Sequence, residues 1–340
     1  MYFKVDSTYT MKKYLSLILI GILSVPNVAA QSKIIFDTDF GGDADDLGAL
    51  AMIHNLQSHG ETELLAVMCW STEEYAVSGI DAVNTFYGRP HIPIGVRKDG
   101  KFHEPWNHSK PITEVLPFNE SYDSATEAVA LYRKLLSDAD ENSITIITVG
   151  PLANIKNLLE SEPDSNSPLS GKELINQKVS EFVIMGGQYP EGEWEWNFNG
   201  NMEGVTRFVI ENLKEVPVTF LGYEVGLVIK TGEVFNELET SHPLYIGYKH
   251  FSEFAPWIKE NYKGRILDNS SYDQTAILYA VRNGLGDYWD RVDNGFNKAD
   301  DEGGNIWVEG EKTNHSYLTL LKDPEEMATI IESLMLGNLE

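Results

Sequence analysis

The sequence is poor in cysteine, in basic residues and in repeats, and each shortage excludes a class of protein. Cys69 is the only cysteine among 340 residues, so the chain cannot form an internal disulfide. There are 26 lysines and arginines against 52 aspartates and glutamates, a formal net charge of −26. Such a surface repels nucleic acid and anionic membrane, and it favours neutral or cationic small ligands. No internal repeat or low-complexity tract is present.

Long apolar runs are also missing, because the run from Leu15 to Val25 is too short to span a bilayer. It follows Met11-Lys12-Lys13 and precedes Val28-Ala29-Ala30, a pattern typical of a secretory signal peptide. We expect residues 1–30 to be a signal peptide cleaved near Ala30 and Gln31, with Met11 a candidate for the true start. An exported chain without disulfides favours a periplasmic location in a bacterium over secretion from a eukaryote.

The rest of the chain, residues 31–340, is predicted to be a single domain without membrane association. Without residues 1–30 it holds 23 basic and 51 acidic residues, a formal net charge of −28. The hydrophobic content of 42% is enough for a large core, and no convincing linker interrupts it.

The most informative stretch runs from Ile34 to Asp46 and holds five aspartates within ten residues. The apolar start predicts a buried strand, and Asp37 and Asp39, two residues apart, would emerge on one side of its end. Apolar residues at helical spacing then predict a helix whose first turn contains Asp45 and Asp46, where the helix dipole favours carboxylates. This density of oxygen ligands indicates Ca²⁺ or Mg²⁺ rather than zinc. The alternative is a solvated acidic turn, the role expected for Asp43.

The remaining chain alternates strand-like and helix-like segments, which predicts an α/β fold. We expect a Rossmann-like three-layer sandwich with a mostly parallel central sheet flanked by helices, plus a helical C-terminal excursion after residue 230. Residues 98–123 are predicted to be a long irregular loop, of the kind that forms lids or binding loops. Capping boxes are expected at Ser124–Glu127 and Ser271–Gln274. Asn305 to Leu320 is predicted to be a hairpin, with a last helix from Pro324 to Leu336.

The stretch Asp37-Thr38-Asp39-Phe40-Gly41-Gly42-Asp43-Ala44-Asp45-Asp46 resembles the D-x-D-x-G-x-D-D signature of the inosine-uridine-preferring nucleoside hydrolases, with two extra residues. Four later segments resemble family motifs in the family's order, and the resemblance covers nearly all of residues 31–340. They are Thr148 to Asn154, Met185-Gly186-Gly187, Glu195 to Glu203, and the segment at Asp273. The chain is similar to a divergent, exported bacterial member.

The resemblance implies a set of site residues. Ca²⁺ would be held by Asp39, Asp46, the backbone carbonyl of Val149, and Asp273. Asp39 would also be the general base, and Asp37 would orient the ligands. The residues implied to bind substrate are Asp45, Trp70, Met185, Glu195 and Asn197. Relatives of this fold are commonly dimers or tetramers, so the resemblance also implies a homo-oligomer.

Two positions depart from the family pattern. Tyr272 stands where members often have the histidine that assists the leaving group, and it is the second catalytic candidate. Trp70 stands where members have an asparagine that contacts ribose. If another acid is needed, the 98–123 loop offers His103 and His108. The metal end of the site therefore matches the family, while the sugar and leaving-group ends differ from it.

The expected function is calcium-dependent hydrolysis of the N-glycosidic bond of ribonucleosides or related ribosides. A non-catalytic, calcium-dependent sugar-binding or nucleoside-binding protein of the same fold is one alternative. A haloacid-dehalogenase-type phosphohydrolase, with Asp37 as nucleophile, is a more distant one, because Gly286-Asp287 is followed by Asp290 one residue early. An EF-hand is disfavoured, since the twelfth position counted from Asp37 is Gly48 rather than glutamate.

Overall fold

The structure, a computed structural model, describes residues 1–3 and 31–338, and Gln31–Glu340 form one compact unit. The predicted signal peptide falls on residues that are almost all outside this description. Within the unit, strand β1 (Ser32–Thr38) is buried on both sides. Ile34 and Phe36 pack into one hydrophobic cluster and Ile35 into another, because successive strand side chains point to opposite faces. The sheet therefore has a core on each face.

The central sheet has nine strands in the order β11-β14-β8-β6-β5-β1-β2-β3-β4. Every neighbouring pair is parallel except β11 and β14 at one edge. The other strands of this sheet are β2 (Thr62–Cys69), β3 (Ile94–Val96), β4 (Thr126–Glu127), β5 (Ile144–Thr148), β6 (Val179–Met185), β8 (Val218–Leu221), β11 (Trp289–Val292) and β14 (His315–Leu320). The predicted mostly parallel sheet is confirmed.

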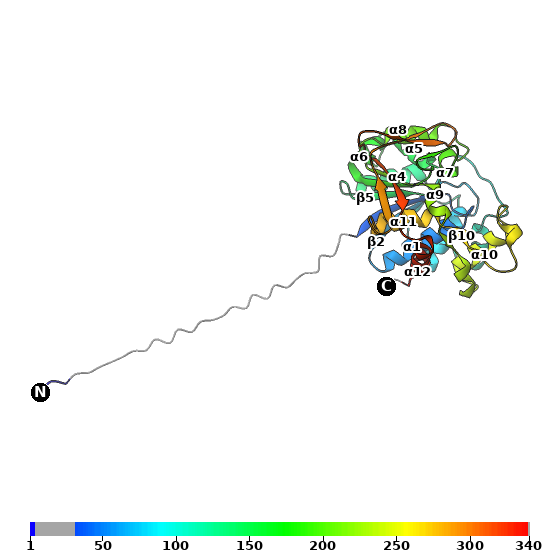
Figure 1. Ribbon diagram of the computed structural model, residues 1–340, viewed down its shortest axis with the longest axis horizontal. Coiled ribbons are helices and arrows are strands. Elements are labelled where there is room, and N and C mark those ends of the chain that lie inside the picture. The colour runs from blue at the N-terminus through cyan, green and yellow to red at the C-terminus, as the bar shows by residue number, and fades with distance from the viewer. Residues whose placement is uncertain (4–30, 339–340) are drawn as a thin grey trace. The chain divides into compact units, whose positions relative to one another are not determined.

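Helices cover both faces of this sheet, which confirms the three-layer sandwich. One face packs against α1 (Asp45–Ser58), α2 (Ala76–Phe86), α10 (Pro243–Phe254), α11 (Tyr272–Arg282) and α12 (Pro324–Met335). The other packs against α4 (Ala128–Asp138), α5 (Ala153–Glu160), α6 (Gly171–Lys178) and α8 (Val205–Asn212). Figure 1 shows α5, α6 and α8 on one side of the domain and α1, α10 and α12 on the other. Among the described residues, no helix has both the length and the apolar character needed to cross a membrane.

Several short helices and strands lie outside the three layers. The small helices are α3 (Ser109–Val115), α7 (Trp196–Asn199), α9 (Tyr223–Leu227), η1 (Glu233–Glu237) and η2 (Lys259–Asn261). Strands β12 (Gly295–Ala299), β13 (Asn305–Glu309) and β7 (Glu191–Gly192) form an antiparallel sheet, and β9 (Lys230–Thr231) pairs with β10 (Asn269–Ser270). The helical C-terminal excursion is present as η1, α10, η2 and α11, before the chain returns to the central sheet.

Four local predictions are wrong. Asn305 to Leu320 is not a hairpin, because β13 pairs with β12 while β14 joins the central sheet beside β8. The 98–123 segment is not wholly irregular, since it contains α3. Helix α4 is capped by Glu127, whose carboxylate accepts from the N–H of Ala130, so Ser124 has no capping role. Ser271 makes no side-chain cap either, because its hydroxyl contacts Thr231 instead.

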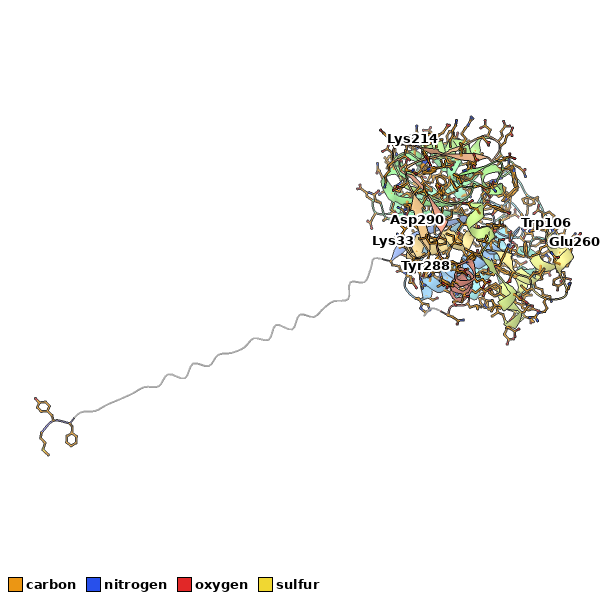
Figure 2. All side chains as sticks on the ribbon, viewed as in Figure 1. Lys33, Trp106, Lys214, Glu260, Tyr288 and Asp290 are labelled. Atoms are coloured by element: carbon orange, nitrogen blue, oxygen red, sulfur yellow. The ribbon has the colours of Figure 1, made fainter. Side chains whose placement is uncertain are left out.

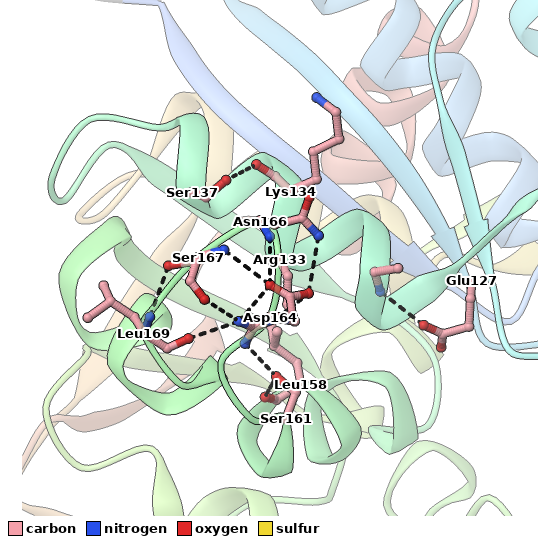
Figure 3. A network of polar contacts seen from close by, with 11 residues as sticks. Glu127, Arg133, Lys134, Ser137, Leu158, Ser161, Asp164, Asn166, Ser167 and Leu169 are labelled. Carbon is pink, nitrogen blue, oxygen red and sulfur yellow. Dashed lines mark hydrogen bonds and ion pairs between the residues drawn. The ribbon is translucent and has the colours of Figure 1, made fainter.

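A buried arginine ties together the helices behind the sheet. Arg133 of α4 is 2% exposed, and its guanidinium lies 3.0 Å from Asp164 and donates to Ser161 and to the carbonyls of Ser167 and Leu169 (Figure 3). Burying a charge is costly unless it is paired and hydrogen-bonded, so this network fixes the connection between α5 and α6 on α4. The neighbouring α4 residue, Tyr132, donates a buried hydrogen bond from its hydroxyl to Asp37 near the end of β1.

Candidate active site

The candidate site lies at the edge of the parallel sheet where the strands end in loops. The strand order changes direction at β1, which has β2 on one side and β5 on the other. Crevices form at such a switch point, outside the carboxyl ends of the strands. The backbone N–H of Val149 donates to Asp37 O at 2.8 Å, and the N–H of Trp70 donates to Thr38 O at 2.7 Å. Three loop starts therefore meet at one place.

A cavity of about 1060 Å³ opens at this edge. Its walls include most of the predicted site residues: Asp39, Asp45, Asp46, Trp70, Val149, Met185, Glu195, Asn197, Tyr272 and Asp273. Asp37 is the only member of the predicted set that is not among the lining residues. In Figure 2 the loop residue Trp106, which also lines the cavity, lies on the opposite side of the domain from Lys33 at the start of β1.

Three carboxylates meet closely in this cavity. Asp45 and Asp46, in the first turn of α1, and Asp273, in the first turn of α11, place ligand atoms within 4.8 Å of one another. All three residues are at most 3% exposed. Asp45 accepts from the backbone N–H groups of Tyr272 and Asp273, each at 3.2 Å, so it joins the two helix starts. Asp45 and Tyr272 are 227 residues apart in sequence, so only the tertiary fold brings them into contact.

Electrostatics indicate that these carboxylates need a positive partner. Burial raises the pKa of Asp45, Asp46 and Asp273 well above the ordinary value, and the charges of neighbouring aspartates raise it further. Thr38 donates a hydrogen bond to Asp46, which is too little to neutralise the group. The donor set is all oxygen and the site is buried, so the residues fit a hard divalent cation.

Asp39 and Val149 lie in the same cavity but outside this close triad. Asp39 accepts a hydrogen bond from the indole N–H of Trp196 at 2.8 Å, and Val149 O accepts one from the side-chain amide of Asn197 at 2.9 Å. Gly150 permits the approach of the two loops, since a Cβ there would lie 2.8 Å from Asp39 N. The predicted ligand set and the observed triad therefore share Asp46 and Asp273, while Asp45 takes a position beside them.

The segment around Glu195 shapes the cavity wall through hydrogen bonds to backbone. The carboxylate of Glu195 caps α7, accepting from Asn197 N at 3.0 Å and from Phe198 N at 3.1 Å, and it also accepts from Gly187 N at 2.9 Å. Burial raises the pKa of Glu195 to about 7. Asn197 donates to Met185 O as well as to Val149 O. These residues hold the ends of β5, β6 and α7 together at the cavity.

Asp37 is placed behind the site. It is 3% exposed and accepts from the hydroxyl of Tyr132 at 2.8 Å and from the amide of Asn154 at 3.0 Å. Both oxygens are therefore occupied within the core, away from the cavity. This geometry argues against Asp37 as an aspartyl nucleophile.

Asp43 and the two loop histidines are not where the sequence suggested. Asp43 is not a solvated residue, because it lines the cavity and accepts from Ala44 N and from Asn269. His108 is fully buried, and its Nε2 lies 2.8 Å from Asp43 O. His103 lies outside the cavity lining and pairs with Glu73 at 2.8 Å. Neither histidine lines the cavity.

Several cavity residues were missed by the sequence analysis. They are Arg97 after β3, Glu104 and Trp106 from the 98–123 segment, Tyr223 from α9, and Trp257 after α10. The charge balance of the cavity is strongly negative, with seven carboxylate side chains, while Arg97 is the only lysine or arginine in its lining among the residues that the structure describes. Arg97 itself is paired with Asp99 at 3.0 Å and stacks over the ring of Trp70.

Comparison with known families gives one match over most of the chain. The family model described as "Inosine-uridine preferring nucleoside hydrolase" matches residues 34–331. A search of curated protein sequences finds no match.

Solved structures with similar folds include three of note. A purine-preferring ribonucleoside hydrolase from Gardnerella vaginalis has a TM-score of 0.68 and 15% identity, over 90% of this chain and 98% of that one. An inosine-uridine preferring nucleoside hydrolase from Bacillus anthracis has a TM-score of 0.62 and 14% identity, over 90% and 100%. The type III effector protein XopQ, complexed with adenosine diphosphate ribose, has a TM-score of 0.60 and 14% identity, over 91% and 94%. At these identities the similarity establishes the fold.

Proposed function

The chain belongs to the inosine-uridine preferring nucleoside hydrolase family, whose members are N-glycosyl hydrolases, and from this premise we propose that it is a calcium-dependent hydrolase of ribonucleosides or related ribosides. The observation that carries the proposal is the triad of Asp45, Asp46 and Asp273, buried at the bottom of a cavity at the switch point of the sheet. The products would be the free base and the sugar.

A calcium ion fits the donor set. Asp46 and Asp273 would hold it together with Asp39 and the Val149 carbonyl, which line the same cavity, and Asp45 lies beside them in the triad. Calcium takes six to eight oxygen ligands in flexible geometry, so water and sugar hydroxyls can complete its shell. When bound, the ion would offset the charge of the carboxylates and increase the acidity of a coordinated water.

Asp39 is proposed as the general base. Its pKa is raised to about 6, chiefly by burial, with the charges of Asp43 and Glu104 adding to the shift and the Trp196 hydrogen bond opposing it. A base with a pKa near the working pH is the most effective at taking a proton from water. The carboxylates around it would also stabilise the positive charge that develops on the sugar as the glycosidic bond breaks.

Tyr272 is proposed to contact the leaving group. It lines the cavity, and its ring stacks on Tyr223 with centroids 5.2 Å apart. Burial raises the pKa of the Tyr272 phenol above its usual value of about 10, and the neighbouring Tyr223 adds to the shift. Tyr272 can therefore donate a hydrogen bond, but it is a poor acid.

The charge of the cavity favours an uncharged riboside. A phosphorylated ligand such as adenosine diphosphate ribose, the molecule bound in the XopQ structure, would bring two negative charges or more into a cavity with seven carboxylates. One bound divalent ion and Arg97 cannot offset that repulsion. The proposed substrate is therefore a nucleoside or another neutral N-riboside.

Export by the signal peptide, a periplasmic or secreted location and a homo-oligomeric state are further parts of this proposal. Export and location are proposed from the sequence of residues 1–30, and the oligomeric state from the family resemblance. The second candidate function, non-catalytic binding of a nucleoside or sugar, is favoured by the presence of Tyr272 and Trp70 at positions where relatives carry histidine and asparagine.

A substrate screen tests the proposal. The mature protein, residues 31–340, is incubated with a panel of purine and pyrimidine nucleosides and p-nitrophenyl riboside, with and without a chelator. Release of reducing sugar that disappears on chelation would support the hydrolase. Calcium-dependent binding without release would support the non-catalytic alternative, and neither result on any riboside would exclude both.

A further inference from the structure

Residues 103–107 form a strap that crosses the edge of the cavity and is held at both ends. On its N-terminal side, Phe102 N donates to Thr72 O at 3.2 Å, and Glu74 N donates to Phe102 O at 2.9 Å. His103 adds a contact of 2.8 Å to the fully buried Glu73. This side of the strap is therefore anchored to the segment that follows β2.

The C-terminal side of the strap is anchored to the acidic turn after β1. His108 N donates to Gly41 O at 3.0 Å, and the Nε2 of His108 lies 2.8 Å from Asp43 O. The side chain of Asn107 packs where a Cβ of Gly41 would lie, 2.4 Å away, so this contact requires glycine at position 41. His250 of α10 lies 3.1 Å from Pro105 O in the middle of the strap.

Three residues of this strap, Glu104, Trp106 and Asn107, line the cavity. The carboxylate of Glu104 is half-buried and has no hydrogen bond or ion pair to any residue that the structure describes. Five of the other six carboxylates of the wall, Asp39, Asp43, Asp45, Asp46 and Glu195, accept hydrogen bonds from protein donors, and the sixth, Asp273, belongs to the triad. Glu104 is therefore a free carboxyl group in a rigid segment.

The surroundings of Glu104 favour its protonated form. Burial raises the pKa of Glu104, the charge of Glu73 raises it further, and His103 acts in the opposite direction. Glu104 is also near enough to Asp39 for its charge to raise the pKa of that base. The charged groups that act on it from other elements are Asp39 after β1 and Glu73 after β2, and Arg97 after β3 is the cation that lines the same cavity.

We propose that Glu104 is the general acid that protonates the departing nitrogen base, an inference that rests on the proposed N-riboside hydrolysis. In this step water adds to the anomeric carbon as the bond between that carbon and the nitrogen breaks. The bonding electron pair stays on the nitrogen heterocycle, which receives the proton of Glu104. Asp39 receives a proton from the water. Proton exchange with solvent then returns Glu104 to the acid and Asp39 to the carboxylate.

Other acids of the site are less suited to this role. Tyr272 has a phenol whose pKa is raised further by burial. His103 and His108 are engaged with Glu73 and with Asp43 O. The aspartates of the triad would be ligands, and the carboxylate of Glu195 is occupied by three backbone N–H groups.

Leaving-group dependence tests this inference in the full mature protein. Inosine needs its base protonated, whereas p-nitrophenyl riboside releases a stable phenolate without help. Glu104→Gln should lower kcat/KM about 10²–10³-fold on inosine and less than about tenfold on p-nitrophenyl riboside, the range expected for loss of one acid–base group. Glu74→Gln, a carboxylate beside His103 that does not line the cavity, is the matched control and should change both values less than about threefold.

A second variant tests the same role without introducing the carboxamide of glutamine. Glu104→Ala should show the same split, and added formate or acetate buffer should restore part of its activity on inosine but not on the nitrophenyl compound. Equal losses on both substrates, or no rescue, would overturn the role of Glu104 while leaving the hydrolase intact. A wild-type protein that releases no sugar from any riboside would instead remove the proposed function, and this inference with it.

Discussion

The indole N–H of Trp196 donates a hydrogen bond of 2.8 Å to the carboxylate of Asp39, across 157 residues of sequence. Asp39 follows the central strand β1, and Trp196 begins α7, which is held to β5 and β6 by Asn197. The bond fixes one oxygen of the proposed base. A tryptophan is required for it, because phenylalanine has a ring of similar character but no donor.

Trp196→Phe should therefore lower kcat more than it changes KM. A hydrogen bond to a charged group contributes about 1.5–3 kcal/mol when buried, and Trp196 is 38% exposed, so a loss of roughly tenfold is expected. Steady-state kinetics on the best substrate of the screen measures it. Trp194→Phe is the control, since Trp194 lines the same cavity and its indole donates no hydrogen bond to any residue that the structure describes, and this change should cost less. An equal loss in both variants would contradict the role of the donor.

Metal removal should abolish activity. Excess EDTA should eliminate turnover, and Ca²⁺ should restore it, because the buried triad requires a counter-charge. Asp46→Asn should weaken calcium affinity by more than tenfold, while Asp290→Asn, at an exposed position of β11, should leave it unchanged. Isothermal titration with Ca²⁺ and elemental analysis of the purified protein provide the measurement. Full turnover in a metal-free sample would refute the metal site.

The two aspartates after β1 should behave differently on substitution. Asp39→Asn should keep the fold and lose about 10²–10⁴-fold in kcat, since an amide cannot accept the proton of water. Asp37→Asn should act chiefly on stability, because both oxygens of Asp37 accept hydrogen bonds inside the core. Kinetics and thermal unfolding of both variants separate the effects. An inactive but fully stable Asp37→Asn, beside an active Asp39→Asn, would support the phosphatase-type nucleophile.

A 5′-phosphate on the substrate should reduce activity. The seven carboxylates of the cavity repel the added charge, so kcat/KM for a nucleoside monophosphate should be at least about tenfold lower than for the nucleoside. Added salt should narrow this difference by screening. Parallel assays at low and high ionic strength provide the check, and equal values for both substrates would show that Arg97 or a bound cation accepts the phosphate.

His54 should make the protein less stable in acid. It is fully buried, 2.8 Å from Asn84 and stacked on Tyr87, and burial lowers its pKa to about 3. In the unfolded chain the imidazole takes up a proton below its ordinary pKa of about 6.5, while the folded form does not. The contribution of His54 to the free energy of unfolding is therefore fully present above pH 6.5. It decreases as the pH falls towards 3, by at most about 1.4 kcal/mol per pH unit.

His54→Gln isolates this contribution from the carboxylates of the site, which titrate in the same range in both proteins. Urea unfolding at several pH values between 7.5 and 4.5 gives the stability difference between wild type and variant. The free energy of unfolding of the wild type, minus that of the variant, should decrease as the pH falls. A difference that stays constant over this range would show that the folded protein can protonate His54.

The sequence by itself determined the fold class and predicted the acidic cluster of the site. Apolar strand segments alternating with amphipathic helices predict a parallel sheet, and the five aspartates from Asp37 to Asp46 are local in sequence, so their clustering follows from the chain itself. Val149 and Met185 were expected near Asp39 only from the resemblance to the family, and the parallel sheet gives the physical reason, because its strands end at one edge.

Only the tertiary structure decided the partners that depend on long-range packing. Examples are the indole of Trp196 on Asp39, the backbone N–H groups of Tyr272 and Asp273 on Asp45, and the strap of Glu104, which is anchored to segments distant in sequence on both sides. The same is true of the strands, since β14 joins β8 rather than its neighbour β13 because its apolar residues are buried there. The spacing of residues along a sequence predicts only which side chains share a face of one helix or strand. A site of this kind is instead assembled from the ends of several helices and strands that the core brings together.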